Sequence, residues 1–133
     1  LGDEVLLLDE HTKLQSGKPL DVYRDPQSYA AADLMSDPGV NPFITKASLV
    51  AAARKAAVRP EHVYLASAPP PGEVNEFQMD VWGLETSGDE TFIHGSVEDN
   101  PWVVRCSGMA HVVPGQRLPI LVRNDDIMRF GVV

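Results

Sequence analysis

Cysteine, basic residues and long apolar runs are all scarce in this chain of 133 residues. Its one cysteine, Cys106, excludes an internal disulfide, and it has no Cys or His neighbour at the spacing of a zinc site. The 11 Lys and Arg residues against 19 Asp and Glu give a net charge of −8, which argues against nucleic acid as a partner. No apolar run approaches the ~20 residues that span a bilayer. These absences favour a protein of the reducing cytoplasm.

Motifs of common active sites are missing too. Gly17-Lys18 resembles the end of a phosphate-binding loop, but Thr12 stands where the first glycine belongs and Pro19 where a Ser or Thr would hold magnesium. The four histidines form no pair at i, i+4 spacing, and no carboxylate completes a legible triad. The sequence therefore predicts no catalytic, cofactor-binding or metal-binding residue.

What the chain does contain is a series of short apolar runs separated by turn residues. Residues 5–8 and 12–15 predict a β-hairpin, Pro19 opens a helical turn, and Pro26 opens a helix that runs to about Met35. From Val58 onward, alternating apolar residues and regular turn signals predict short strands with one buried face. This spacing is typical of a small barrel or sandwich.

Three aromatic residues lie on successive predicted strands: Trp82, Phe92 and Trp102. Aromatic side chains on small barrels can stack against bases or sugars, so these residues are the candidates for an interface or ligand surface. Packing in a core is the alternative, and it is the use that aromatic residues more often have.

The order of the motifs resembles the C-terminal region of ATP-binding subunits of maltose-importer-type ABC transporters. GKPLDVY at 17–23, followed by Pro26 and Asn41, matches the spacing in the end of the ATPase domain. VRPEH at 58–62 is similar to the Arg-Pro-Glu segment that leads into an accessory barrel, and GDETFIH at 88–94 is similar to a later strand. Each motif is weak alone, but their order covers nearly the whole chain.

The resemblance implies a mainly β fold in two parts. Residues 1–41 would be the C-terminal tail of the ABC ATPase domain, a hairpin plus short helices, and residues 42–133 an OB-like accessory β-barrel. The first residues are acidic and include no Met, so we expect a piece of a longer chain. ATP and magnesium would bind upstream, in the full-length parent, and the piece itself would not be an enzyme.

The implied function is regulation and dimerisation of an importer ATPase for sugars or related solutes. The expected partners are a second copy (a homodimer), membrane permease subunits, and a regulator or small ligand on the barrel. The implied location is the cytoplasmic side of the inner membrane. Two alternatives stay open, namely a free-standing OB-like module that binds oligosaccharide or single-stranded nucleic acid, and a small hydrolase.

The stretch 46–57, KASLVAAARKAA, gives conflicting signals. Its alanine content, with Ser48 as an N-cap, favours a helix by intrinsic propensity. In the family that the chain resembles, this stretch leads as a strand into the Arg-Pro-Glu segment. We therefore prefer a hairpin that turns near Ala53-Arg54 and keep the helix as the alternative.

Overall fold

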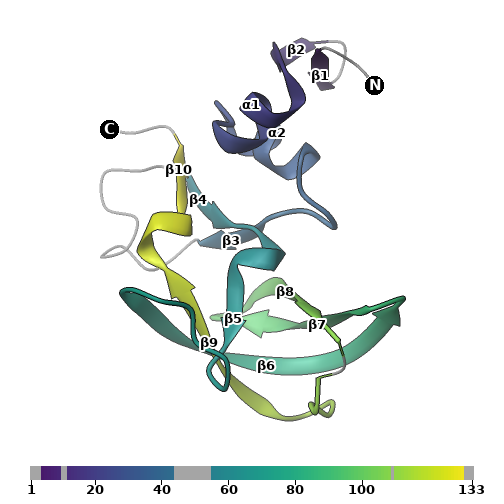
Figure 1. Ribbon diagram of the computed structural model, residues 1–133, viewed down its shortest axis with the longest axis vertical. Helices are drawn as coiled ribbons and strands as arrows, with labels where there is room; N and C mark the ends of the chain where they lie inside the picture. The colour runs from purple at the N-terminus through teal and green to yellow at the C-terminus, as the bar shows by residue number, and fades with distance from the viewer. Residues whose placement is uncertain (1–3, 10–11, 44–54, 109, 131–133) are drawn as a thin grey trace.

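The computed structural model describes residues 4–9, 12–43, 55–108 and 110–130. Figure 1 shows two parts, a small N-terminal unit and a larger, curled β structure below it. Within the described residues, no helix has the length and apolar character that crossing a bilayer requires.

The N-terminal unit packs two short helices against one face of a hairpin. Ser28 caps the second helix, since its Oγ accepts a hydrogen bond from the Ala31 N–H at 3.1 Å. The second helix therefore begins after Ser28 and not at Pro26, as the sequence predicted. The predicted hairpin and the first helix, which starts at Pro19, are confirmed. The elements are β1 (Val5–Asp9), β2 (Thr12–Gly17), α1 (Pro19–Arg24) and α2 (Tyr29–Leu34).

The β structure contains two antiparallel sheets. The larger has the order β5-β9-β6-β7-β8 and the smaller the order β10-β4-β3. The mainly β, OB-like fold class is confirmed by this curled arrangement (Figure 1). The strands are β3 (Asn41–Phe43), β4 (Lys55–Val58), β5 (Val63–Leu65), β6 (Val74–Ser87), β7 (Glu90–Val97), β8 (Asn100–Ser107), β9 (Arg117–Arg123) and β10 (Met128–Phe130), with 3-10 turns η1 (Pro60–His62) and η2 (Asn124–Asp126).

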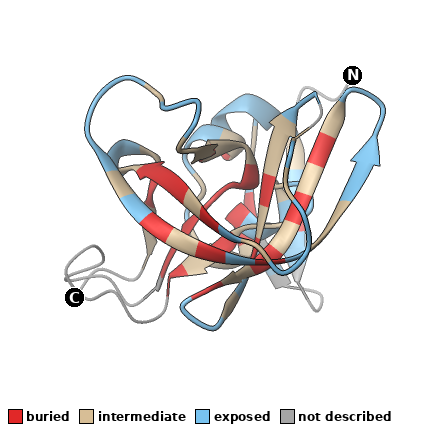
Figure 2. Cartoon of the chain, turned by 90° about the horizontal axis from the view of Figure 1, so that it is seen from below, coloured by how far each residue is buried: buried red, intermediate tan, exposed pale blue. Residues whose placement is uncertain are grey.

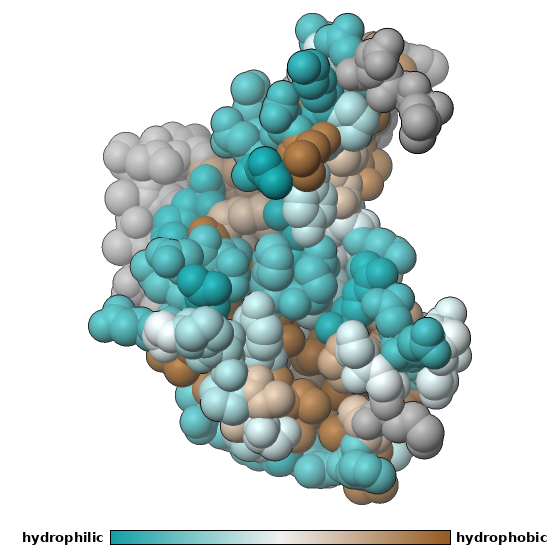
Figure 3. Space-filling view, viewed as in Figure 1, coloured by the Kyte–Doolittle hydropathy of each residue, from teal (hydrophilic) through white to brown (hydrophobic). Residues whose placement is uncertain are grey.

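One hydrophobic core fills the curl of the larger sheet, beneath the smaller one. Buried and less buried residues alternate along β7, as a strand with one covered face requires (Figure 2). Phe43, Phe77 and Trp102 form an aromatic cluster in this core, with the rings of Phe43 and Trp102 in edge contact at 5.1 Å. Figure 3 shows a largely hydrophilic surface with apolar side chains gathered in a hollow of the barrel half.

Strand β6 bends at a bulge between Val81 and Gly83. Gly95 on β7 lies so close to this bend that a Cβ atom there would be 2.2 Å from the Asp80 carbonyl oxygen. Only glycine permits this approach, and the bend leaves Trp82, between the two bulge positions, 60% exposed.

The end of the ambiguous stretch 46–57 is strand. Residues 55–58 form β4, which pairs with β3 on one side and β10 on the other. The helix interpretation is therefore wrong for residues 55–57, because two ladders of backbone hydrogen bonds outweigh alanine's helix propensity. The turn expected at Ala53-Arg54 lies outside the described residues. The boundary predicted after Asn41 falls within β3, and the division into two domains stays a prediction.

Candidate functional site

A buried arginine joins the N-terminal unit to the barrel. Arg59, between β4 and η1, is 4% exposed. Its Nη2 donates to the Tyr23 carbonyl oxygen at 2.7 Å, its Nε donates to Ser36 Oγ at 3.0 Å, and its guanidinium carbon lies 3.8 Å from the centre of the Tyr23 ring. A buried guanidinium is stable only when hydrogen-bonded, and burial lowers the pKa of Arg59. These contacts tie the end of α1 and the segment after α2 to the first strands of the barrel.

Glu61 binds the same tyrosine from the other side of Pro60. The Tyr23 hydroxyl donates to Glu61 Oε2 at 2.5 Å. Burial, followed by this hydrogen bond to a carboxylate, raises the pKa of Tyr23 to about 12. The second oxygen, Glu61 Oε1, is buried without a hydrogen-bond partner in the part of the chain that is described. The Arg-Pro-Glu segment, singled out from the sequence by resemblance alone, is thus a clamp on Tyr23.

A second contact joins the N-terminal unit to the barrel. Tyr29, the first residue of α2, meets Phe130 of β10 edge to face at 6.2 Å. Two elements far apart in the barrel sequence, η1 and β10, therefore contact the helix pair.

Asn41 takes the place of a neighbouring strand at one point on the edge of β8. Its side-chain amide donates to the Val103 carbonyl oxygen at 2.8 Å and accepts from the Val103 N–H at 2.8 Å. Asn41 is only 2% exposed, so both bonds are shielded from water. Next to it, the Trp102 Nε1–H donates to the Pro42 carbonyl oxygen at 2.8 Å. In the sequence, Asn41 is notable only for its distance from Pro26 in the resemblance, and nothing there predicts its hydrogen bonds to Val103.

The three aromatic candidates do not lie together on one surface. Trp102 is 2% exposed and belongs to the core. Phe92 stands opposite Arg105, and Arg105 is three residues from Trp102 on β8, so Phe92 and Trp102 point to opposite faces of the sheet. The Arg105 guanidinium carbon lies 5.8 Å from the centre of the Phe92 ring. Trp82 is the one strongly exposed member of the three. Trp82 and the half-buried Phe92 remain candidates for an interface or ligand surface, whereas Trp102 packs in the core.

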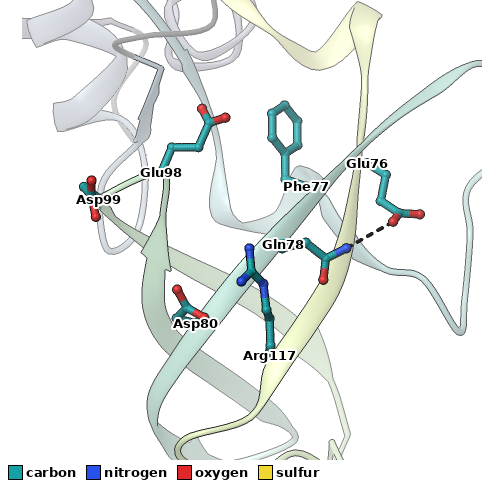
Figure 4. Close-up of a pocket in the computed structure, with 7 residues that line it drawn as sticks. All are labelled: Glu76, Phe77, Gln78, Asp80, Glu98, Asp99 and Arg117. Carbon is teal, nitrogen blue, oxygen red and sulfur yellow. Dashed lines mark hydrogen bonds between the residues drawn. The ribbon is translucent and has the colours of Figure 1, made fainter.

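An acidic cavity of about 410 Å³ opens beside β6, β9 and the β7–β8 turn (Figure 4). In Figure 4, the Arg117 side chain lies between Asp80 and Gln78, and the Phe77 ring points away from them. The turn residues Glu98 and Asp99 adopt left-handed φ angles of 51° and 67°. The excess of carboxylates disfavours anionic ligands. The residues that line the cavity are Glu76, Phe77, Gln78, Asp80, Glu98, Asp99 and Arg117.

Other reactive side chains lie apart from one another. His94 pairs with Glu85 at 2.9 Å on the outer face of the sheet. The Cys106 thiol donates to the Thr91 carbonyl oxygen at 3.7 Å, and burial raises the pKa of this thiol, which disfavours the reactive thiolate. No group of three or more potential metal ligands occurs among the residues described.

Comparison with known proteins gives three relatives and one family. Residues 56–130 match the family model of the TOBE domain. The sn-glycerol-3-phosphate import ATP-binding protein UgpC of Chromobacterium violaceum is 27% identical over 152 aligned residues, which cover 98% of this chain and 40% of that protein. UgpC 3 of Agrobacterium fabrum is 25% identical, with 98% and 41% covered.

The third relative is the uncharacterized ABC transporter ATP-binding protein YurJ of Bacillus subtilis. It is 23% identical to this chain, and the alignment covers 98% of the chain and 43% of YurJ. The chain therefore spans about two fifths of the length of the curated relatives it matches.

Proposed function

The chain belongs to the TOBE-domain family, and we propose that it is the accessory C-terminal part of the ATP-binding subunit of an ABC importer, with a regulatory and dimerising role. The observation that carries the proposal is the alignment of 98% of the chain, helical unit included, with two proteins named as import ATP-binding proteins. In this proposal ATP and magnesium bind in the remainder of the full-length subunit, and the described segment binds neither.

The outer face of the N-terminal hairpin supports this placement. Leu7 packs inward against Val22 and Ala31, while Leu6 and Leu8 point away and are 55% and 53% exposed. A two-stranded sheet with exposed leucines gains stability when another body covers it. In the proposal, that body is the ATPase domain of the same subunit.

In this proposal, the contacts of Arg59 couple movements of the N-terminal unit to the barrel. The hairpin and helices would follow the ATPase domain as it closes on ATP and reopens, and the Arg59–Tyr23–Glu61 contacts would carry the barrel with them. A barrel-to-barrel contact between two subunits would keep them joined when the ATPase domains separate, so that closing again is an intramolecular event. A ligand or regulator on the barrel changes this equilibrium only by the difference between its affinities for the two states.

The proposed solute is a sugar or a related polyol derivative, and the proposed partners are a second copy of the subunit and membrane permease subunits. The names of the two UgpC relatives refer to import of sn-glycerol 3-phosphate, a phosphorylated polyol. The subunit would act on the cytoplasmic side of the membrane. The free-standing module for oligosaccharide or nucleic acid is the weaker reading, because Trp102 is buried and no platform of three aromatics forms.

A truncation of the full-length subunit tests the proposal. The variant ends after Asn41, and its ATP hydrolysis, its dimerisation by light scattering and its transport in vesicles with the permease are compared with the complete subunit. We expect hydrolysis to persist while dimerisation or regulated transport weakens. A matched point variant, Arg59→Ala in the complete subunit, should keep the barrel but uncouple its movement from that of the N-terminal unit. If all three measurements are unchanged by the truncation, the accessory role is wrong.

A further inference from the structure

The larger sheet curls until its two edge strands approach each other, but it does not close. β5 and β8 stand at the two ends of the order β5-β9-β6-β7-β8, and Cα atoms of β8 lie within 8 Å of both β5 and the preceding turn η1 (Figure 1). Among the described residues, no backbone hydrogen bond joins η1 or β5 to β8. The curl therefore leaves a seam, bounded by η1 and β5 on one side and by residues 105–107 of β8 on the other.

Backbone groups of both strands face this seam. The Val103 N–H and C=O bind a side chain on the side away from β7, and alternate residues of a strand direct their groups alike, so those of Arg105 and Ser107 also point away from β7. The Ala66 N–H donates to a β9 carbonyl oxygen at 3.3 Å, so the Leu65 N–H, at the other parity, points away from β9. A molecule placed in the seam thus meets both donors and acceptors.

A cavity of about 360 Å³ lies in this seam, and its wall is mainly apolar. Such a volume is at the low end of ligand sites, ~300–1,000 Å³. The apolar wall residues are Val63, Leu65, Ala68, Cys106 and Ala110. Leu65, Cys106 and Ala110 pack against the core but stay only partly buried, so an apolar occupant gains free energy by covering them. Since Val63 is buried and Ala68 is exposed, the cavity extends from the core to the surface.

The charged groups at the cavity wall already have partners of opposite charge. The Arg105 guanidinium binds Glu90 through Nε at 2.6 Å and Nη2 at 3.1 Å. Glu61 accepts the Tyr23 hydroxyl, and although burial lowers the pKa of Arg59, the Glu61 carboxylate opposes that shift because the two charges attract. A charged ligand would leave water without a free counter-charge, which is costly. The wall therefore favours an uncharged occupant.

We propose that the seam cavity binds a small uncharged molecule, with an apolar ring or chain and one hydroxyl or amide group. The apolar part lies against Leu65, Cys106 and Ala110. The polar group exchanges hydrogen bonds with the backbone of Arg105 or Ser107, which no segment of the described chain satisfies through its backbone.

The cavity also shares a residue with the junction to the N-terminal unit. Glu61 lines the cavity, and its carboxylate holds Tyr23. A bound molecule adjoins this contact and regulates it by the difference between its affinities for the coupled and uncoupled states. In this regulatory sense the inference rests on the function proposed above. The truncation after Asn41 tests that function, whereas direct binding to this chain tests the cavity, so failure of one leaves the other standing.

Three probes of equal size and different charge test the class of ligand: benzyl alcohol, benzylamine and benzoate. Each is titrated at neutral pH into the 133-residue chain and followed by amide NMR shifts. Benzyl alcohol should bind with a Kd on the order of 1 mM, as expected of so small a ligand, and should shift Leu65, Arg105 and Ser107. Both charged probes should bind at least about tenfold more weakly. Tighter binding of either charged probe, or no saturable shift at the seam, would overturn the proposal.

Two matched substitutions check the location. Ala110→Phe fills the cavity and should weaken the binding of benzyl alcohol at least about tenfold. Val112→Phe enlarges a residue that packs against the same core without lining the cavity, and should change the Kd less than about threefold. Equal effects of the two would show that the cavity is not the site. The comparison of probes and the position of the shifts decide the question even if Ala110→Phe does not fold.

Glu61→Gln removes the charge but keeps the shape of the wall. For an uncharged ligand it should change the Kd of benzyl alcohol less than about threefold. A loss of tenfold or more, or a gain in the binding of benzoate above that of benzyl alcohol, would mean that charge selects the ligand and that the proposed class is wrong.

Discussion

Arg59 holds Tyr23 by both its backbone and its ring: Nη2 donates to the Tyr23 carbonyl oxygen at 2.7 Å, and the guanidinium carbon lies 3.8 Å from the ring centre. A carbonyl bond alone would let the end of α1 rotate, and stacking alone would let it slide. The two together fix the position of α1 against the barrel. Substituting Arg59 should therefore loosen the contact between the N-terminal unit and the barrel.

Replacing Arg59 with Ala should lower the free energy of unfolding by about 3 kcal/mol, because three contacts disappear and the Tyr23 carbonyl loses its partner. Arg59→Lys keeps the charge but loses the planar stack and one bond, and should cost about half as much. Urea denaturation measures both. Equal stability of Arg59→Lys and wild type would show that charge alone is sufficient.

The hydrogen bond between Tyr23 and Glu61 predicts a loss of stability in alkaline solution. The pKa of Tyr23 is raised from 10.0 to about 12 in the folded chain, so its contribution is fully present below pH 10 and is lost as the pH rises towards about 12. Tyr23→Phe has no hydroxyl to titrate. The difference in unfolding free energy between wild type and Tyr23→Phe should therefore shrink over this interval, and a constant difference would contradict the prediction.

Removing the Asn41 side chain should expose the edge of β8. Asn41→Ala removes both hydrogen bonds to the N–H and C=O of Val103, which the buried Asn41 side chain shields from water, and should cost about 2–3 kcal/mol. Asn75→Ala is the matched control, since its amide makes one long bond of 3.4 Å to Val122, and should cost less than about 0.5 kcal/mol. Thermal or urea unfolding compares the two. Equal costs would mean that the two bonds at Val103 add nothing specific.

The two tryptophans should respond in opposite ways to the same substitution. Trp102→Ala removes a side chain that is 2% exposed and hydrogen-bonded to Pro42, and should cost about 3–5 kcal/mol. Trp82→Ala removes a side chain that is 60% exposed and should change stability by less than about 0.5 kcal/mol. In the full-length subunit, Trp82→Ala should instead weaken association of the barrels, as light scattering would show. An unchanged association constant would remove Trp82 from the contact surface.

The local elements of this fold follow from short-range sequence features. Strand β7 lies in the region after Val58 for which the alternating apolar residues predict short strands, and its buried residues alternate as that pattern requires. Pro19 begins α1 as expected, since its fixed φ suits the first helical position. The start of α2 was predicted too early because proline at 26 is a weaker signal than the N-cap that Ser28 provides.

Long-range partners decided the rest. Tyr23 and Glu61 are 38 residues apart, and Asn41 and Val103 are 62 residues apart, so no local sequence pattern predicts either contact. The strand at 55–58 prevails over a helix-forming composition because two neighbouring strands bind it at once. Trp82 and Trp102 are alike in the sequence, yet the bulge and Gly95 leave one in solvent while the curled sheet encloses the other. Alternation shows that a strand has two faces, but only the tertiary structure decides which face is covered, because covering depends on segments distant along the chain.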